Sequence, residues 1–403
     1  MCAVKMTSDS RSESGDGSRR NIFALGFASF FTDVSSEMVF SLLPTFFLSL
    51  PGASVAILGF VEGIAEALSY ALRSVSGIFS DKVRKRKLLV LVGYGLSSIL
   101  KPFFAVARAP IDVLVIRVSD RVGKAVRTSP RDALLSESVS EKHRGAAFGL
   151  HRTMDQAGAI LGPVLASAVL LVFGLTVRDI FWLSLIPGLI ALLILLFFVK
   201  ERAGKSTGDF KVLAGVKSVL KRDFSLLLVV VGVFSLGAFN FSFVLLNAQE
   251  AGIAESLIPL VYAVVNVAHV AIAIPAGVLS DRIGRENVLL MGYGIFLTSV
   301  LLMMLLPVNG FDAFIIALFF GAYVGVVETV QRAMVPAYVG KCLLGTAYGL
   351  YYLIVGSAFF VSNAVVGSLW EHFGSSIAVT YSAATSVLSI IFMLLFLARR
   401  KNQ

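Results

Sequence analysis

Apolar stretches of membrane-spanning length recur along almost the whole chain, with short polar or charged segments between them. A helix needs about 20 mostly apolar residues to cross the hydrocarbon core of a bilayer, where it satisfies its own backbone hydrogen bonds. Twelve spans are predicted, at residues 22–50, 54–80, 88–108, 110–128, 145–173, 178–199, 223–250, 255–280, 288–307, 311–336, 344–370 and 376–398. The chain is therefore expected to be an all-α polytopic membrane protein.

The amino-acid composition excludes a water-soluble globule. Hydrophobic residues make up 57% of the 403 residues and charged residues only 15%, and the mean hydropathy is +0.86. Cys2 and Cys342 lie far apart and match no metal-ligand spacing. We therefore expect neither a disulfide framework nor a metal site, and no cofactor.

A repeat with a period near 200 residues divides the chain into two parts. Residues 77–82, 93–95 and 145–150 recur at 277–282, 292–294 and 345–350, with their glycines in register. This period is longer than that of a solenoid repeat, and it fits a duplicated six-helix unit. The twelve transmembrane helices are therefore predicted to form two pseudo-symmetric six-helix bundles.

The repeat and the distribution of charge predict the order of the domains. The segments are a disordered cytoplasmic tail at 1–20, an N-terminal six-helix bundle at 21–199, a cytoplasmic linker at 200–222, a C-terminal six-helix bundle at 223–398 and a cytoplasmic tail at 399–403. The first twenty residues contain no apolar run, which argues against a cleaved signal peptide. Within the linker, residues 212–220 form either a short amphipathic surface helix or a solvated connector.

Lysine and arginine gather in alternate connections, chiefly at 82–87, at 200–222 and at the C-terminus. By the positive-inside rule both termini are cytoplasmic, and we expect a multi-pass protein of the cell inner (cytoplasmic) membrane. The net charge of +10 then reflects topology and not a nucleic-acid partner. The expected partners are the lipid bilayer, a small-molecule substrate and protons, and the chain is expected to act as a monomer.

The two repeated loops resemble the loop after the second helix of each half in the major facilitator superfamily, which has the pattern G-x-L-a-D-r-x-G-r-k. The residues at these positions are Gly77, Asp81, Arg84 and Arg86 in the first copy, and Gly277, Asp281, Gly284 and Arg285 in the second. The resemblance implies that these loops control conformational change. Arg84 stands where the family has glycine, and an arginine at positive φ would cost energy.

A second motif lies in the 145–173 span, where residues 158–167 resemble the G-x-x-x-G-P-x-x-G-G pattern of antiporters in the same superfamily. Gly158 and Gly162 lie on one stripe, where a neighbouring helix can approach closely, and Pro163 is expected to bend the helix. The resemblance implies efflux, and simple small-residue packing is the alternative. The runs 33–38 and 127–132 are similar to a prokaryotic subgroup of the superfamily.

Carboxylates lie inside the predicted spans. Asp33 and Glu37 are four residues apart and project from one face of the first helix, and Glu62 and Glu66 repeat this spacing on the second. A low-dielectric environment and a neighbouring carboxylate both favour the neutral form of such a group, which can then exchange a proton near neutral pH. The residues predicted to couple transport to protons are Asp33, Glu37, Glu62, Glu66, Asp120 and Asp155.

Charge pairing is the alternative role for these carboxylates, because a buried ion is costly unless it has a partner. Arg73 lies two turns from Glu66, and Lys124 lies one turn from Asp120. The arginines that are candidates to pair with carboxylates of the first or fifth helix are Arg117, Arg121 and Arg127. The two roles are compatible, since proton binding can break an ion pair.

His151 and Asp155 are also four residues apart, with Arg152 between them. A histidine near a carboxylate can titrate close to neutral pH. The alternative is a satisfied hydrogen bond near the cytoplasmic end of the helix. These two interpretations predict different pH dependences for transport.

The second half carries amides and aromatic rings in place of charges. An aromatic wall with a few amides suits an amphipathic organic molecule, whereas core packing or the interfacial belt is the alternative for any single ring. Glu328 and Arg332 are expected to pair with each other. The residues predicted to line the substrate cavity are Arg73, Arg117, Arg121, Lys124, His151, Arg152, Asn240, Asn247, Asn266, His269, Tyr262, Glu328, Arg332, Tyr352 and Asn363.

The leading interpretation is a secondary active transporter that works by alternating access and exports a small organic compound in exchange for protons. Organic anion or organophosphate transport is an alternative, with Arg73, Lys101 and the basic residues of the 110–128 span as anion ligands. Metal-ion export through Asp33, Glu37 and His269 is a weaker alternative. The paired loops argue against a channel. The sequence contains no Walker A motif, nucleophile elbow or His-rich metalloprotease motif, so the chain is not expected to be an enzyme.

Overall fold

The computed structural model describes residues 15–83, 85–139, 144–201, 219–220, 222–306, 310–339 and 344–401, and helices are the only regular secondary structure in these residues. The helices are α1 Gly15–Phe40, α2 Leu43–Leu48, α3 Val55–Val83, α4 Arg86–Leu100, η1 Lys101–Val106, α5 Pro110–Glu137, α6 Arg144–Phe173, α7 Val177–Leu183, α8 Leu185–Phe198, α10 Arg222–Ser235, α11 Phe241–Glu250, η3 Glu255–Leu257, α12 Ile258–Ile283, α13 Arg285–Leu305, α14 Gly310–Tyr338, α15 Leu344–Phe373 and α16 Ser375–Lys401. The predicted all-α class is confirmed.

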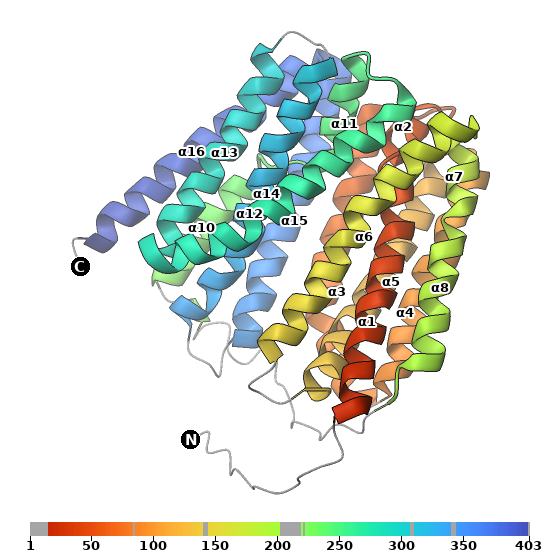
Figure 1. Ribbon diagram of the computed structural model, residues 1–403. Helices are drawn as coiled ribbons and strands as arrows, with labels where there is room; N and C mark the ends of the chain where they lie inside the picture. The colour runs from red at the N-terminus through yellow and green to blue at the C-terminus, as the bar shows by residue number, and fades with distance from the viewer. Residues whose placement is uncertain are drawn as a thin grey trace, which may run out of the picture.

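The helices form two groups that lie side by side, with α1 to α8 in the first and α10 to α16 in the second (Figure 1). In the first group α1 packs against α6 and α8, and α5 packs against α3 and α4. In the second group α14 packs against α12 and α13, and α13 packs against α16. We call the end where α1 begins and α16 finishes the termini end, and the opposite end the far end.

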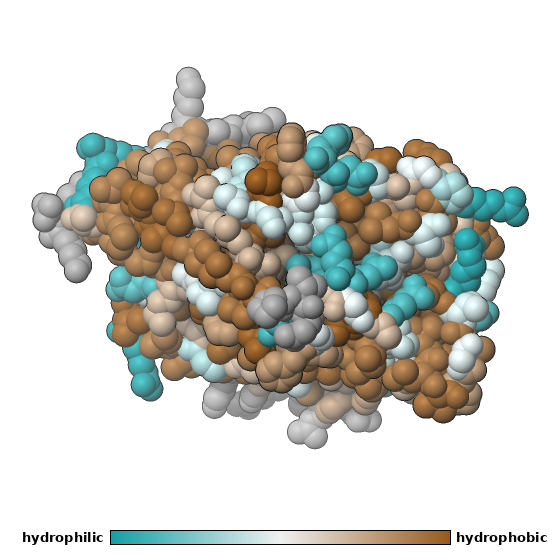
Figure 2. Space-filling view, turned by 90° about the horizontal axis from the view of Figure 1, so that it is seen from above, coloured by the Kyte–Doolittle hydropathy of each residue, from teal (hydrophilic) through white to brown (hydrophobic). Residues whose placement is uncertain are grey.

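Ten helical spans in the described ranges are long and apolar enough to cross a membrane. Two of the twelve predicted spans are not among them, for different reasons. Helix α5 is rich in charged residues, and the predicted 223–250 span is divided into the shorter helices α10 and α11. The outer rim of the molecule seen from the far end is largely apolar, as a lipid-facing surface requires (Figure 2).

The helix boundaries differ from the predicted ones in several places. Helix α1 begins at Gly15, within the segment predicted as a disordered tail, and α5 continues to Glu137, beyond the predicted end at 128. The Asn240 side chain accepts a hydrogen bond from Ser242 N at 2.9 Å and so caps α11 after the break. Most of the predicted linker, at 202–218 and 221, lies outside the described residues.

The two groups contact each other between α3 and α15 and between α6 and α12. A Cβ added to Gly59 of α3 would collide with the backbone of Asn363 on α15, so the helices touch at backbone distance there. Val55 N donates to Glu371 Oε2 at 2.8 Å in the same region. These contacts join the groups near the far end.

Helix α12 makes a second connection to the first group. The Asn266 amide donates to Ala159 O of α6 at 3.0 Å, and Ser167 Oγ donates to the backbone carbonyl of Ser256. Toward the termini end, by contrast, Phe148 and Arg152 of α6 are exposed, and the ribbons of α6 and α12 diverge (Figure 1). The groups are therefore packed together at the far end and spread apart toward the termini end.

The small-residue stripe predicted on the fifth span packs against α1. A Cβ on Gly158 would meet the backbone of Phe30, and one on Gly162 would meet the backbone of Val34. Close approach of a neighbouring helix is therefore confirmed. Pro163 lies inside α6, which continues through it.

Candidate functional site

Asp33 and Asp155 meet between α1 and α6. Both side chains are partly buried, and they are hydrogen-bonded to each other. A hydrogen bond between two carboxyl groups needs a proton on one of them, because a carboxylate is an acceptor only. Lys124 of α5 interacts electrostatically with Asp33. The structure thus brings two of the predicted coupling residues, Asp33 and Asp155, together.

Glu37 lies one turn further along α1 and reaches across to the second helix group. The Tyr262 hydroxyl of α12 hydrogen-bonds its carboxylate, and the Tyr262 ring stacks on Phe241 with centroids 4.2 Å apart. Glu37 Oε2 is buried without a hydrogen-bond partner in the described part of the chain. A charged carboxylate with a buried, unpaired oxygen raises the free energy of the folded state, so the Glu37 side chain favours binding a proton or a ligand.

The other predicted coupling residues are held in ion pairs or hydrogen bonds. Glu62 accepts two hydrogen bonds from Arg117, and Glu66 pairs with Arg121 at 3.0 Å. The Arg117 guanidinium also lies over the Phe40 ring, with 3.9 Å to the centroid. The partners of Arg117 and Arg121 were predicted on the first and fifth membrane spans. Their ion-pair partners, Glu62 and Glu66, lie on α3 instead. These ion pairs correspond to charge pairing, the alternative role for these carboxylates. Proton coupling by Glu62 and Glu66 stays a prediction.

Helix α5 lies in the interior of the first group, as its charge density predicts. Asp120 is buried and accepts a short hydrogen bond from Ser97 of α4. Lys101 is completely buried, and its ammonium group donates to Ser36 Oγ of α1 at 2.8 Å. Sequence reasoning considered Lys101 only as an anion ligand. Its position between two apolar runs was the signal for a buried role.

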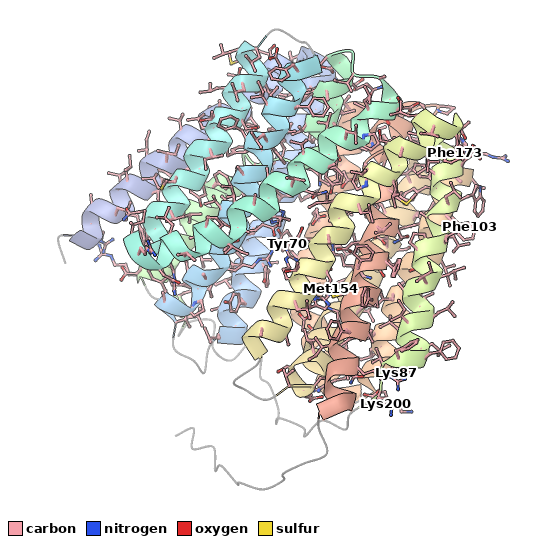
Figure 3. The ribbon with its side chains drawn as sticks, viewed as in Figure 1. Tyr70, Lys87, Phe103, Met154, Phe173 and Lys200 are labelled. Carbon is pink, nitrogen blue, oxygen red and sulfur yellow. The ribbon has the colours of Figure 1, made fainter. Side chains whose placement is uncertain are left out.

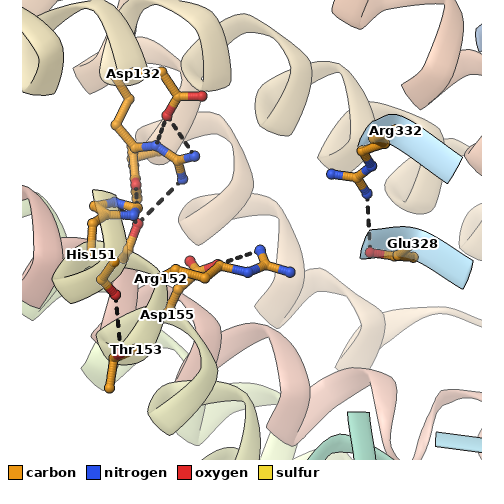
Figure 4. Close-up of polar contacts among 11 residues, drawn as sticks. Asp132, His151, Arg152, Thr153, Asp155, Glu328 and Arg332 are labelled. Carbon is orange, nitrogen blue, oxygen red and sulfur yellow. Dashed lines mark hydrogen bonds and ion pairs between the residues drawn. The ribbon is translucent and has the colours of Figure 1, made fainter. Parts of the chain in front are cut away.

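His151 is buried in a hydrogen-bonded chain that joins three helices. Its Nε2 lies 3.1 Å from Ser29 Oγ, which in turn lies 2.8 Å from the Tyr94 hydroxyl. Arg131 contacts the same Ser29 hydroxyl at 3.4 Å and pairs with Asp132 at 2.9 Å (Figure 4). This geometry corresponds to the satisfied hydrogen bond that was the alternative for His151. Arg131 was part of a sequence motif but was not predicted as a site residue.

Two ion pairs face each other from the two helix groups (Figure 4). Arg152 pairs with Asp155 at 3.2 Å on α6, and Arg332 pairs with Glu328 at 3.0 Å on α14. The predicted Glu328–Arg332 pairing is therefore present. The Arg152 side chain is 56% exposed and both members of the α14 pair are 39% exposed, so these charges are accessible from the space between the groups.

Tyrosines from both groups stack where α3 meets α15. The rings of Tyr70 and Tyr352 lie 5.7 Å apart with 30° between their planes, and the ring of Tyr348 stacks on Tyr352 with centroids 6.1 Å apart. Figure 3 shows Tyr70 at the boundary between the groups. Tyr70 was not predicted as a site residue, although it follows Glu66 by four residues and so lies on the same face of the helix.

The predicted amides of the second group have mainly structural partners. Asn363 Oδ1 accepts from Asn240 N at 2.9 Å, and Asn266 bonds the α6 backbone as described above. Asn247 is buried on α11, and His269 is partly buried on α12, where it interacts electrostatically with Glu328. The aromatic wall is also partly core, because Phe239 and Phe243 are fully buried in a cluster of rings.

The second copy of the repeated loop has the geometry that its sequence predicts. Gly284 has φ of +93°, a conformation that favours glycine, and Arg285 donates to Ala333 O at 2.8 Å. Gly277 and Asp281 lie at the end of α12, and the Asp281 side chain is exposed. In the first copy, Arg86 pairs with Glu137. Arg84 and the side chains of Arg73 and Asp81 are outside the described residues, and Gly77 is described only as part of α3.

The alternatives to organic-compound export find less support in this geometry. The carboxylates of α3 already neutralise the charges of Arg117 and Arg121, which lowers the attraction of these two arginines for an anion. The described ranges contain no group of three or more His, Cys, Asp or Glu side chains placed to hold a metal ion. The predicted trio for metal export is accordingly not assembled, since Glu37 contacts Tyr262 and Asp33 contacts Asp155.

The chain is similar in sequence and in structure to several proteins that are described as membrane transporters. The Major Facilitator Superfamily model matches residues 25–247 and 225–403. An uncharacterized MFS-type transporter of Methanocaldococcus jannaschii is 33% identical over 389 residues, which cover 93% of this chain and 94% of the relative. The multidrug resistance protein MdtG of Proteus mirabilis is 24% identical over 334 residues, 79% of each chain. A mutant of the nucleoside transporter NupG shares the fold with a TM-score of 0.79 at 12% identity, over 94% of this chain and 99% of that one.

Proposed function

The chain belongs to the major facilitator superfamily, a family of transporters and not of enzymes, and on this basis we propose that it is a secondary active exporter of a small organic compound driven by protons. The single observation that carries the proposal is the hydrogen-bonded carboxyl pair Asp33–Asp155. The pair joins α1 to α6, and α6 is one of the helices that contact the second group. A proton on this pair is therefore linked to the packing of the two groups.

Loss of the shared proton has a direct mechanical consequence. Two adjacent carboxylates repel each other, so the deprotonated pair must separate or recruit a cation. Arg152 already pairs with Asp155, and Lys124 acts on Asp33, so both cations are placed to compensate. The α1–α6 contact accordingly differs between the protonated and deprotonated states, and the conformational equilibrium shifts with it.

Glu37 transmits the same change to the second group. Its hydrogen bond to Tyr262 connects α1 with α12 across the boundary, and α12 is also tied to α6 through Asn266. Protonation of Glu37 removes the charge that strengthens the Tyr262 bond. We infer that the far end opens when this bond weakens, as alternating access requires.

The substrate site lies in the same space between the groups. Stacked rings of Tyr70 and Tyr352 offer planar apolar surface, and the exposed pairs Arg152–Asp155 and Glu328–Arg332 offer both signs of charge. Such a lining fits an amphipathic organic molecule with a planar part. The name of the MdtG relative supports export as the direction.

Orientation follows from the basic residues. With both termini in the cytoplasm of an inner-membrane protein, the termini end faces inward. The structure, which is packed at the far end and spread toward the termini end, then corresponds to an inward-facing state. We propose that this state accepts the compound from the cytoplasm, and that the protein works as a monomer.

A two-stage experiment tests the proposal. Purified protein is screened by thermal stabilisation against nucleosides, cationic dyes and organic acids, since a ligand stabilises the folded state by mass action. The best compound is then followed in proteoliposomes with and without a pH gradient. Transport is expected to need the gradient and to be abolished in Asp33→Asn. The matched control is Asp179→Asn, whose carboxylate caps α7 through Thr176. Transport that does not depend on the pH gradient, or that is fully retained in Asp33→Asn, would overturn the proposal.

A further inference from the structure

Basic side chains gather around the end of α8 on the outside of the first helix group. The members of this α8 basic cluster are Arg20, Lys85, Lys87 and Lys200. Figure 3 shows Lys87 and Lys200 next to each other at the termini end of α8. Within the described part of the chain none of these four cations forms an ion pair with a carboxylate. Among the described residues, the cluster therefore carries positive charge that no ion pair neutralises.

Backbone contacts hold this cluster together. The Asn21 side chain accepts a hydrogen bond from Lys200 N at 2.9 Å and donates to Lys200 O at 3.1 Å. The Glu201 carboxylate accepts from Arg86 N at 3.1 Å and from Lys87 N at 2.8 Å. These bonds join the beginnings of α1 and α4 to the residues after α8. The backbone at Lys87 and Lys200 is thus held by bonds that do not use the charged groups of these side chains.

The nearby carboxylates are already occupied. Glu201 is engaged by the two backbone amides, and Glu137 pairs with Arg86. Arg20 uses one amino group to bond Phe197 O at 2.9 Å, and Lys87 bonds Leu196 O at 2.8 Å. A guanidinium has five N–H donors and an ammonium three, so further donors on both side chains remain for an external anion.

An exposed apolar strip runs along α8 and ends at this cluster. Ile186, Leu189, Leu193 and Phe197 are 56%, 44%, 52% and 64% exposed, and their spacing of three or four residues puts them on one face of the helix. At 1.5 Å per residue the strip is about 16 Å long. The neighbouring Phe198 ring lies under the Arg20 guanidinium, 5.4 Å from its centroid. An apolar strip that leads to several cations matches the shape of a phospholipid.

We propose that the α8 basic cluster binds the phosphate headgroup of an anionic phospholipid whose acyl chain lies along the α8 strip. Basic residues at a membrane surface attract anionic lipids, and each one contributes about a five-fold factor in affinity. The strip distinguishes a lipid from a soluble phosphate, because a free phosphate makes no use of apolar surface. The site lies on the outside of the first group, and it does not depend on the proposed transport activity.

The test is a lipid titration of the purified full-length protein in a neutral detergent, read by the thermal unfolding midpoint. Dioleoylphosphatidylglycerol is expected to raise the midpoint at concentrations where dioleoylphosphatidylcholine does not. The double variant Lys85→Gln/Lys200→Gln removes charge without removing a side-chain hydrogen bond, and it is expected to bind phosphatidylglycerol about 25-fold more weakly. The matched control, Arg282→Gln on the second group, is expected to bind like the unmodified protein.

Two further probes identify the source of the anion. Inorganic phosphate and the short-chain lipid dihexanoylphosphatidylglycerol are expected to stabilise the protein much less than the dioleoyl lipid. Equal stabilisation by inorganic phosphate would overturn the lipid assignment in favour of a free phosphate site. Equal response to phosphatidylcholine, or an unchanged phosphatidylglycerol affinity in the double variant, would overturn the site itself.

Discussion

Arg117 of α5 and Glu62 of α3 form an ion pair with two hydrogen bonds, 3.1 Å from Nε and 2.7 Å from an amino group, and the two side chains are 0% and 1% exposed. The pair lies next to Phe40 of α1, whose ring faces the guanidinium. Three helices of the first group therefore meet at a neutralised charge. This arrangement explains how a helix as charged as α5 is tolerated in the interior of a membrane protein.

Removing one partner of this pair is expected to be strongly destabilising. Glu62→Gln leaves the Arg117 charge buried and uncompensated, which costs about 3–5 kcal/mol of unfolding free energy. The double variant Glu62→Gln/Arg117→Met removes both charges and is expected to recover part of that loss. Thermal unfolding of the detergent-solubilised variants measures both effects. A single variant as stable as the unmodified protein would contradict the structural role.

The pH dependence of transport is expected to survive substitution of His151. The histidine is buried and bonded to Ser29, which continues the chain to Tyr94, and a glutamine side chain can supply a donor at a similar distance. His151→Gln should therefore keep the pH profile of the unmodified protein in the proteoliposome assay. A profile displaced by a full pH unit would instead make His151 a titrating group of the cycle.

A bulky side chain at Gly59 is expected to open the far end. A Cβ there already collides with the Asn363 backbone, so Gly59→Leu must push α3 away from α15. The change is measured by maleimide labelling of Ala53→Cys in a chain that also carries Cys2→Ser and Cys342→Ser. Labelling should become several-fold faster in Gly59→Leu. Gly149→Leu is the control, because nothing lies within 4 Å of a Cβ at that position. Equal labelling rates would contradict the close packing of the two groups.

The second repeated loop is expected to depend on its glycine. At φ of +93° any other residue is strained, so Gly284→Ala should cost about 1–3 kcal/mol of unfolding free energy. Gly294→Ala is the matched control, since a Cβ there meets open space. Comparison of the two thermal unfolding midpoints measures the difference. An equally small effect for both variants would show that the loop adopts another conformation in solution.

Much of the fold follows from the sequence because a membrane imposes simple rules. Hydrophobic length predicted the transmembrane helices, and the glycines of residues 158–162 predicted the close contact of α6 with a neighbour. The break at Asn240 was not predicted, because one polar capping residue hardly lowers the mean hydropathy of the long apolar segment at 223–250. The start of α1 at Gly15 was missed for the opposite reason, since the polar composition of the first twenty residues does not predict a membrane-spanning helix.

The site was predictable only in part. The i, i+4 spacing placed Asp33 and Glu37 on one face and Glu328 beside Arg332, because helix geometry fixes those relations. Partners from different helices were not predictable, since spacing says nothing about which helices are neighbours. The pairing of Arg117 with Glu62 and the meeting of Asp33 with Asp155 both depend on how α1, α3, α5 and α6 pack. The burial of Lys101 against α1 depends on packing in the same way.

Infrared difference spectroscopy of the protonated carboxyl band in the purified protein tests directly whether Asp33 and Asp155 share a proton. A band is expected near neutral pH that disappears at higher pH, and that is lost or displaced in Asp33→Asn and in Asp155→Asn. Glu371→Gln serves as the control, because that carboxylate caps the beginning of α3 by accepting from Val55 N, and it should leave the band unchanged. A band that is absent from the unmodified protein, or identical in Asp33→Asn and Asp155→Asn, would contradict a proton shared between Asp33 and Asp155.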